Sequence, residues 1–183
     1  MKRLIDILVS CTLLVVLAPV FVILAIAIII DSPGNPLFSQ TRIGRGGRPF
    51  KIYKFRSMVQ SAEKQGFQTA AGDARITKVG QFLRKSSLDE IPQLLNVLKG
   101  EMSLIGPRPF VPVQEKDFPA DFWKKRHTVR PGITGLTQSK FRSTATYELI
   151  IEYDGYYVDH ASTALDLKIA FMTLKILSGS TAT

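Results

Sequence analysis

The sequence has little cysteine and little histidine. Cys11 is the single cysteine, and His127 and His160 are the two histidines. One cysteine cannot form an internal disulfide, and a structural zinc site has no ligands without a cluster of Cys and His side chains. Any metal in this protein must therefore be held by oxygen. With 183 residues, the chain is also too short for two domains of ordinary size.

Charged side chains are missing from one long stretch near the N-terminus. The 24 residues from 7 to 30 carry no charge, although the whole chain has a net charge of +9. As a straight helix this run would be about 36 Å long, against about 30 Å for the hydrocarbon core of a bilayer. Its length predicts a membrane segment.

Three kinds of segment have such an apolar run. A signal peptide has an apolar core of about half this length and a small-residue cleavage site, which is not seen here. A simple spanning helix remains the alternative, but Lys2 and Arg3 precede the run and more basic residues follow it, so both ends favour the cytoplasmic side. Because Ala18 and Pro19 interrupt the helix, we expect a helix-break-helix that enters and leaves by the cytoplasmic face.

Basic side chains are concentrated just after this run. Residues 31–110 hold 13 basic and 6 acidic side chains, whereas residues 111–183 hold 9 and 8. Such a patch suits nucleic acid, anionic lipid or a phosphorylated substrate. We do not expect nucleic acid, because no Lys/Arg-rich helix or series of stacking aromatic residues accompanies the charge. Phosphate groups and lipid headgroups remain.

Residues 50–56 alternate apolar with basic side chains, which is typical of a half-buried strand. Lys54 and Arg56 would then belong to a cationic face. Such a face is usually explained by solvation, and contact with phosphate is the second interpretation.

Helical spacing is clearest between residues 88 and 98. The apolar residues there are Leu88, Ile91, Leu94, Leu95 and Leu98, and Gly100 predicts the end of the helix. Pro92 suits a first helical turn, so we expect Asp89 and Glu90 at or just before the N-terminus of this helix.

Two interpretations of this acidic pair stay open. Residues 87–90 match a capping box, in which the acidic residues serve the helix alone. Alternatively, the helix dipole with Arg84 and Lys85 keeps Asp89 and Glu90 ionised, available as nucleophile and as magnesium ligand.

Two loops combine arginine with a restricted backbone. Residues 106–109 place Arg108 between two prolines, which suits a guanidinium that meets an oxyanion in one geometry. Residues 130–135 begin with Arg130, Pro131 and Gly132, and glycine permits positive φ or the close approach of a ligand. A rigid turn explains the prolines equally well, so each loop alone is weak evidence for a ligand site.

Together, these segments resemble the monotopic phosphoglycosyl transferases, the bacterial sugar transferase family that begins the synthesis of cell-surface glycans. The matching motifs lie in one order at residues 2–7, 53–58, 87–94, 96–100, 103–109, 130–135 and 165–169. We expect an α+β fold, mostly helical with few short strands. A re-entrant membrane segment, residues 1–31, would precede a small catalytic domain with amphipathic interfacial helices, residues 32–183.

The resemblance implies transfer of a sugar-1-phosphate from a UDP-sugar to polyprenyl (undecaprenyl) phosphate, with release of UMP. It also implies Mg²⁺, membrane lipids, and a catalytic domain on the cytoplasmic face of the bacterial inner membrane. A covalent phosphosugar would form on the Asp of the Asp-Glu pair, which by position is Asp89, with Glu90 as its catalytic and metal-binding neighbour. The expected substrate-binding residues are Lys54, Arg56, Arg84, Arg108, Arg130, Pro131 and Gly132.

The sequence departs from the family pattern in three places. Ala18 precedes Pro19 where members usually have serine, and Lys140-Phe141-Arg142 replaces a Gly-Arg pair after Gln138. Long members carry an amino-terminal multi-span domain, whereas this sequence starts at the expected re-entrant segment, so we expect a minimal catalytic unit.

Two other functions stay open. One is a hydrolase that uses Asp89 but passes the phosphosugar to water, and the other is a non-enzymatic membrane-surface adaptor that binds anionic lipid. A homodimer and downstream glycosyltransferases are further candidate partners. The aromatic residues Phe118, Phe122 and Trp123 and the run 165–177 each suit either an interfacial helix or ordinary core packing.

Overall fold

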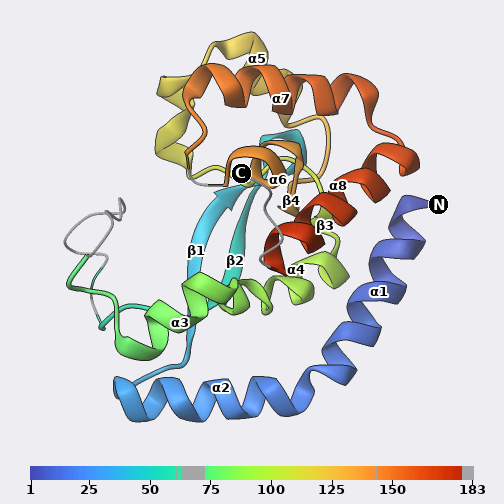
Figure 1. Cartoon of the computed structure of the whole chain (residues 1–183). Helices are drawn as coiled ribbons and strands as arrows, with labels where there is room; N and C mark the ends of the chain where they lie inside the picture. The colour runs from blue at the N-terminus through green and yellow to red at the C-terminus, as the bar shows by residue number, and fades with distance from the viewer. Residues whose placement is uncertain (61, 63–72, 143, 179–183) are drawn as a thin grey trace.

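The computed structural model describes residues 1–60, 62, 73–142 and 144–178 (Figure 1). Its α-helices are α1 (Lys2–Val16), α2 (Ala18–Asp31), α3 (Lys78–Ser86), α4 (Gln93–Lys99), α5 (Ala120–Arg126), α6 (Leu136–Phe141), α7 (Tyr147–His160) and α8 (Thr163–Leu177). The 3₁₀ helices are η1 (Arg45–Gly47), η3 (Leu88–Glu90) and η4 (Pro112–Asp117), and the strands are β1 (Leu37–Ile43), β2 (Pro49–Phe55), β3 (Ser103–Ile105) and β4 (Gly132–Thr134). The predicted mostly helical α+β fold with few short strands is confirmed.

The apolar run forms two helices with a sharp bend between them. Pro19 lies in the first turn of α2, where its missing N–H breaks no hydrogen bond but its ring ends the preceding helix at Val16. The two helix axes are bent by 61° at Leu17. Within the described residues, no single helix is both long and apolar enough to cross a membrane, and α1 with α2 meets that test only as a bent pair.

The first turns of α1 are anchored to the rest of the protein. Lys2 pairs with Asp166 at the start of α8, and Arg3 donates to the carbonyl oxygens of the last turn of α4. Asp6 is buried and accepts hydrogen bonds from the Ser103 hydroxyl and from the backbone N–H of Leu104. The N-terminus therefore contacts residues that follow it by about a hundred positions in the sequence.

The strands form two small sheets. β1 and β2 make an antiparallel hairpin, and β3 pairs in parallel with β4, which brings the loops 106–109 and 130–135 together. The predicted strand over residues 50–56 is confirmed as β2. The cationic face predicted for Lys54 and Arg56 does not include Lys51, because Lys51 and Lys54 lie an odd number of residues apart and so point to opposite faces; Lys51 is exposed, whereas Lys54 is largely buried.

The predicted helix over residues 88–98 is divided in two. Ser87 ends α3 with a left-handed backbone, φ 58°, and residues 88–90 then form the separate 3₁₀ turn η3 before α4 begins at Gln93. The capping box was therefore wrong, since the Ser87 side chain caps no helix. Gly100 ends α4 with φ 84°, as its position predicted.

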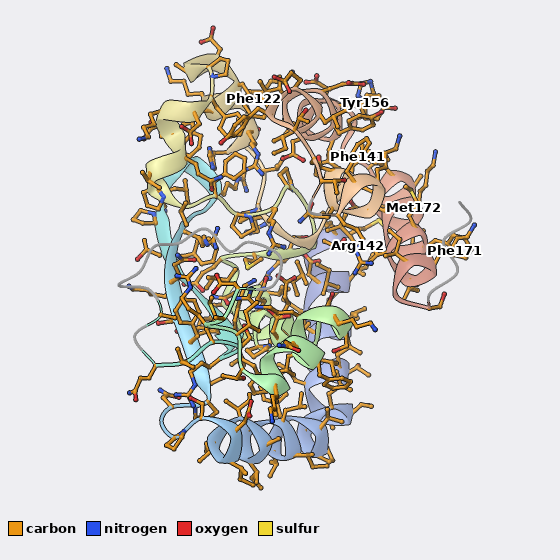
Figure 2. The ribbon with its side chains drawn as sticks, turned by 60° about the vertical axis from the view of Figure 1, so that its left-hand side comes forward. Phe122, Phe141, Arg142, Tyr156, Phe171 and Met172 are labelled. Carbon is orange, nitrogen blue, oxygen red and sulfur yellow. The ribbon has the colours of Figure 1, made fainter. Side chains whose placement is uncertain are left out.

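The two candidate interfacial segments differ. Phe118, Phe122 and Trp123 are buried in an aromatic cluster with Phe110, so core packing is the correct interpretation there. On α8, Leu167, Phe171 and Leu174 are 67%, 71% and 65% exposed. Phe171 and Met172 lie on this helix at the edge of the molecule (Figure 2), so α8 has an unburied apolar face.

Candidate active site

Glu90 is held by two cations. Its Oε1 accepts a hydrogen bond from Lys54 Nζ at 2.7 Å and another from Arg108 Nη2 at 2.8 Å. β2 supplies Lys54, and the loop after β3 supplies Arg108. Burial alone would raise the pKa of Glu90, but the charges and hydrogen bonds of Arg108 and Lys54 hold it well below its usual range. Glu90 is thus ionised.

Asp89 has very different surroundings. Among the described residues, no hydrogen bond or ion pair reaches its carboxylate. Burial raises the pKa of Asp89, and the neighbouring Glu90 raises it further, while Lys54, Arg108 and Arg84 offset part of this rise. Removal from water thus outweighs the nearby cations in setting the direction of this pKa shift.

A cavity of about 1200 Å³ contains both carboxylates. The polar part of its wall includes Lys54, Arg84, Asp89, Glu90 and Arg108. Its apolar part includes Leu13 of α1, Leu17 at the bend, and Leu174 and Ile176 of α8. One continuous space therefore joins a charged site to the apolar helices of the molecule.

The structure separates the predicted substrate-binding residues into two groups. Lys54, Arg56, Arg84 and Arg108 line the cavity with the carboxylates. Two of these have structural partners: Arg84 donates through Nε to the Ser57 hydroxyl at 2.8 Å, and Arg56 donates to the carbonyl oxygens of Ser32 and Pro33 after α2.

Arg130, Pro131 and Gly132 are not part of this cavity wall. Arg130 donates from Nε to the Gly100 carbonyl at 2.9 Å and lines a separate pocket of about 570 Å³. A Cβ on Gly132 would lie 2.1 Å from the Gly106 nitrogen. The close approach that the sequence suggested is therefore made by another strand of the same chain, not by a ligand.

Three charged residues at this site were missed by sequence reasoning. Arg42 lines the cavity and donates to the Pro109 carbonyl at 3.0 Å, and its burial together with Arg108 lowers its pKa to about 10. Arg126 and Asp154 form a buried pair that also borders the cavity. The sequence carried no signal for them beyond a general excess of basic residues, because nothing in it brings residues 42, 126 and 154 together.

The acidic pair supplies carboxylate oxygens of the kind that bind Mg²⁺. Within the described residues, no group of three or more His, Cys, Asp or Glu side chains could hold a metal ion. Mg²⁺ is often bound by one or two carboxylates, with substrate phosphates and water as the remaining ligands. The Asp89 carboxylate, without a partner among the described residues, matches this donor set.

Comparison with known proteins agrees with the family that the motifs indicate. The model of the bacterial sugar transferase family matches residues 1–180, and the chain belongs to this family. The UDP-N-acetylgalactosamine-undecaprenyl-phosphate N-acetylgalactosaminephosphotransferase of Aeromonas hydrophila is 44% identical over 97% of this chain and 44% of its own length.

Two further relatives are UDP-glucose:undecaprenyl-phosphate glucose-1-phosphate transferases. The protein of Klebsiella pneumoniae is 44% identical over 94% of this chain and 39% of its own length. The protein of Caulobacter vibrioides is 41% identical over 96% of this chain and 69% of its own length. The chain thus spans less than half of the Aeromonas and Klebsiella relatives, and the predicted family is confirmed.

Proposed function

We propose that this protein transfers a sugar-1-phosphate from a UDP-sugar to polyprenyl phosphate, such as undecaprenyl phosphate, and releases UMP. The observation that carries the proposal is the half-buried Asp89 carboxylate, which has no partner among the described residues and lies beside Glu90, Lys54 and Arg108. The names of the relatives support the substrate classes, since each includes a UDP-sugar and undecaprenyl phosphate.

Two displacements at one phosphorus atom account for the reaction. In the first, an Asp89 oxygen attacks the phosphorus that carries the sugar, the bond to the UMP oxygen breaks, and a phosphosugar-aspartyl intermediate forms. In the second, a phosphate oxygen of polyprenyl phosphate attacks the same phosphorus, and the Asp89 carboxylate is released. A covalent intermediate lets a soluble donor and a lipid acceptor use one site in turn.

The charges of the cavity wall account for how these residues would lower the reaction barrier. An anionic nucleophile must approach an anionic phosphate, so the barrier falls when fixed cations surround the phosphorus. Lys54, Arg84 and Arg108 supply such charges on the cavity wall. Burial raises the pKa of Asp89 and so makes its carboxylate a stronger base and a better nucleophile. We propose that Asp89 and Glu90 bind Mg²⁺, which would neutralise phosphate charge.

We propose that α1 and α2 form a re-entrant hairpin in the bacterial inner membrane, with the catalytic residues on its cytoplasmic face. Lys2, Arg3 and Asp6 contact the catalytic part of the chain, and α2 leads directly into it, so both ends of the bent pair belong on one side of a bilayer. The cavity wall formed by α1 and α8 fits the entry of a polyprenyl chain from the membrane.

The proposal is tested by separating the two steps. The protein is incubated with UDP-sugar and no lipid, and the peptide containing Asp89 is searched by mass spectrometry for a phosphosugar adduct. We expect one equivalent of UMP per protein and an adduct that disappears when undecaprenyl phosphate is added. Product that forms only with both substrates present, without an adduct, would remove Asp89 as nucleophile.

The same experiment separates the alternatives. Continued UMP release without lipid would identify a hydrolase, and no UMP release with any member of a panel of UDP-sugars would favour the adaptor. The panel also identifies the donor sugar.

A further inference from the structure

A buried ion pair joins α5 to α7 next to the active-site cavity. Arg126 Nη2 lies 2.7 Å from Asp154 Oδ2, and the two side chains are only 2% and 3% exposed. Taking two charges out of water costs several kcal/mol for each ion, so such a pair contributes little net stability. Its presence calls for an explanation other than the strength of the fold.

The pair also has a contact with the backbone of the active-site loop. Arg126 Nη2 donates to the carbonyl oxygen of Arg108 at 2.6 Å, and the Arg126 guanidinium lies 3.5 Å from the centre of the Phe110 ring. Asp154 is fixed in turn by a hydrogen bond from the Thr137 hydroxyl of α6. Three helices thus hold one guanidinium against the loop that carries Arg108.

A second arginine holds the next peptide of the same loop. Arg42 Nη1, from β1, donates to the Pro109 carbonyl at 3.0 Å. The carbonyl oxygens of residues 108 and 109 are therefore both bound by arginines, while the Arg108 side chain extends to Glu90. Arg126 and Arg42 thus fix two successive peptide groups of the loop that carries the Arg108 side chain.

We propose that Arg126 and Asp154 are positioning residues that hold the Arg108 guanidinium where it meets Glu90 and the phosphate of the substrate. This inference rests on the proposed function. A charged hydrogen bond to a backbone carbonyl fixes the loop more tightly than a neutral one. Without this support the Arg108 guanidinium can shift. A shift of even 1 Å is expected to slow a reaction that depends on the position of this charge.

A purely structural role would have different consequences. If the pair only joined α5 to α7, its loss would lower the melting temperature, and its effect on rate would be independent of Arg108. If it acts through Arg108, its effect on rate disappears once Arg108 is absent. A double-mutant cycle distinguishes the two roles.

The cycle compares the wild type, Arg126→Met, Arg108→Met and the double variant in full-length protein in nanodiscs. The readouts are kcat and KM for UMP release, and the melting temperature. We expect Arg126→Met to lower kcat about tenfold or more, with a smaller change in donor KM. In the Arg108→Met background, the same change should alter kcat by less than about twofold. Effects that multiply in the double variant would overturn the proposal.

Two further variants keep the test informative. Arg126→Lys retains a positive charge beside Asp154 but loses the planar fork that reaches both Asp154 and the Arg108 carbonyl. Its melting temperature should stay within a few degrees of the wild type, while its kcat should still fall. Full activity of this variant would overturn the proposal. Lys125→Met is the matched control, because Lys125 joins the same two helices through an exposed pair with Asp159; it should leave kcat unchanged.

Failure of this inference is distinguishable from failure of the proposed function. A wild-type protein that forms no adduct and releases no UMP contradicts the function itself. A wild-type protein that does both, together with independent effects at Arg126 and Arg108, contradicts only the positioning role.

Discussion

Asp89 and Glu90 are adjacent residues with opposite electrostatic surroundings. Glu90 shares one oxygen between Lys54 and Arg108, and its pKa is lowered, whereas burial raises the pKa of Asp89. A pair of titratable groups whose pKa values are driven apart often has two different chemical roles. Here the ionised Glu90 suits a fixed ligand, and the more basic Asp89 suits a nucleophile.

Replacement of Asp89 by Asn separates reaction from folding. The folded pKa of Asp89 is raised above its unfolded value, so its ionised form weakens the fold at pH values above the folded pKa. In the absence of Mg²⁺, Asp89→Asn should therefore melt at the same or a higher temperature, while UMP release falls about a thousandfold or more. A helix-capping role predicts the reverse, a loss of about 0.5–2 kcal/mol in stability with substantial activity.

We expect Lys54 to set the acid limit of UMP release. Its charge is the largest influence that lowers the pKa of Asp89, and it also lowers that of Glu90. Lys54→Met removes the charge, so both pKa values rise, and more carboxyl is protonated at any given pH. We expect the acid limb of the pH profile for UMP release to move to higher pH. Lys54→Arg keeps the charge and should keep the limb near its wild-type position; an unshifted limb in Lys54→Met would contradict this assignment.

The sequence singled out the candidate acidic pair but did not show its full surroundings. Asp89 and Glu90 stood out because two acidic residues precede a helical pattern. Arg130 was an equally clear candidate in the sequence, yet in the structure it donates to the Gly100 carbonyl. A sequence does not show which carbonyl oxygen lies near an arginine. Arg42 and Arg126 were not singled out as site residues, since burial of an arginine depends on contacts with distant segments.

The bend between α1 and α2 has a local cause and a distant one. Pro19 ends α1, and the contacts of Lys2 and Arg3 with α8 and α4 hold its other end. The proline was visible in the sequence. The contacts of the first turn of α1 were not visible, because the sequence around a lysine before an apolar run is the same whether that lysine pairs with Asp166 or faces solvent.

Pro19→Leu should weaken the hairpin, because it restores an unbroken apolar helix long enough to span. Cysteine placed at residue 2, in a Cys11→Ser background, reports the side of the membrane through an impermeant reagent in intact cells. We expect no labelling when Pro19 is present, and a labelled fraction in Pro19→Leu. A cysteine at Ser39 should stay unlabelled in both. Labelling of residue 2 from outside with Pro19 present would show that α1 and α2 span the membrane.

Helical spacing predicted the presence of α4 better than its inward residues or the form of its beginning. Leu95 belongs to the spaced residues but is 38% exposed, whereas Val97, outside the pattern, is fully buried. Gly100 has the left-handed backbone that its type favours. The 3₁₀ turn at residues 88–90 follows the left-handed Ser87 and packs against α3 and β2. The contacts with β2 come from a distant part of the sequence, so spacing alone could not reveal this turn.

At the scale of the molecule, apolar surface and catalytic charge are connected through one cavity. α1, α2 and α8 expose large apolar side chains, among them Val16, Ile30 and Phe171. Leu13 and Leu174, from α1 and α8, line the same cavity as Asp89. In the proposed reaction, this arrangement would give a soluble nucleotide and a lipid different approaches to a single phosphorus atom.

Blocking the apolar part of the cavity should therefore stop the second step and spare the first. Leu13→Trp adds bulk on the cavity wall and keeps the helix apolar, so insertion into the membrane is preserved. We expect the same one equivalent of UMP from UDP-sugar alone, but at least about tenfold slower transfer to undecaprenyl phosphate. Val16→Trp is the matched control, because Val16 lies on the same helix, is 65% exposed and is not part of the cavity wall. If Leu13→Trp slows both steps equally, or if Val16→Trp slows transfer as strongly, the lipid does not enter between α1 and α8.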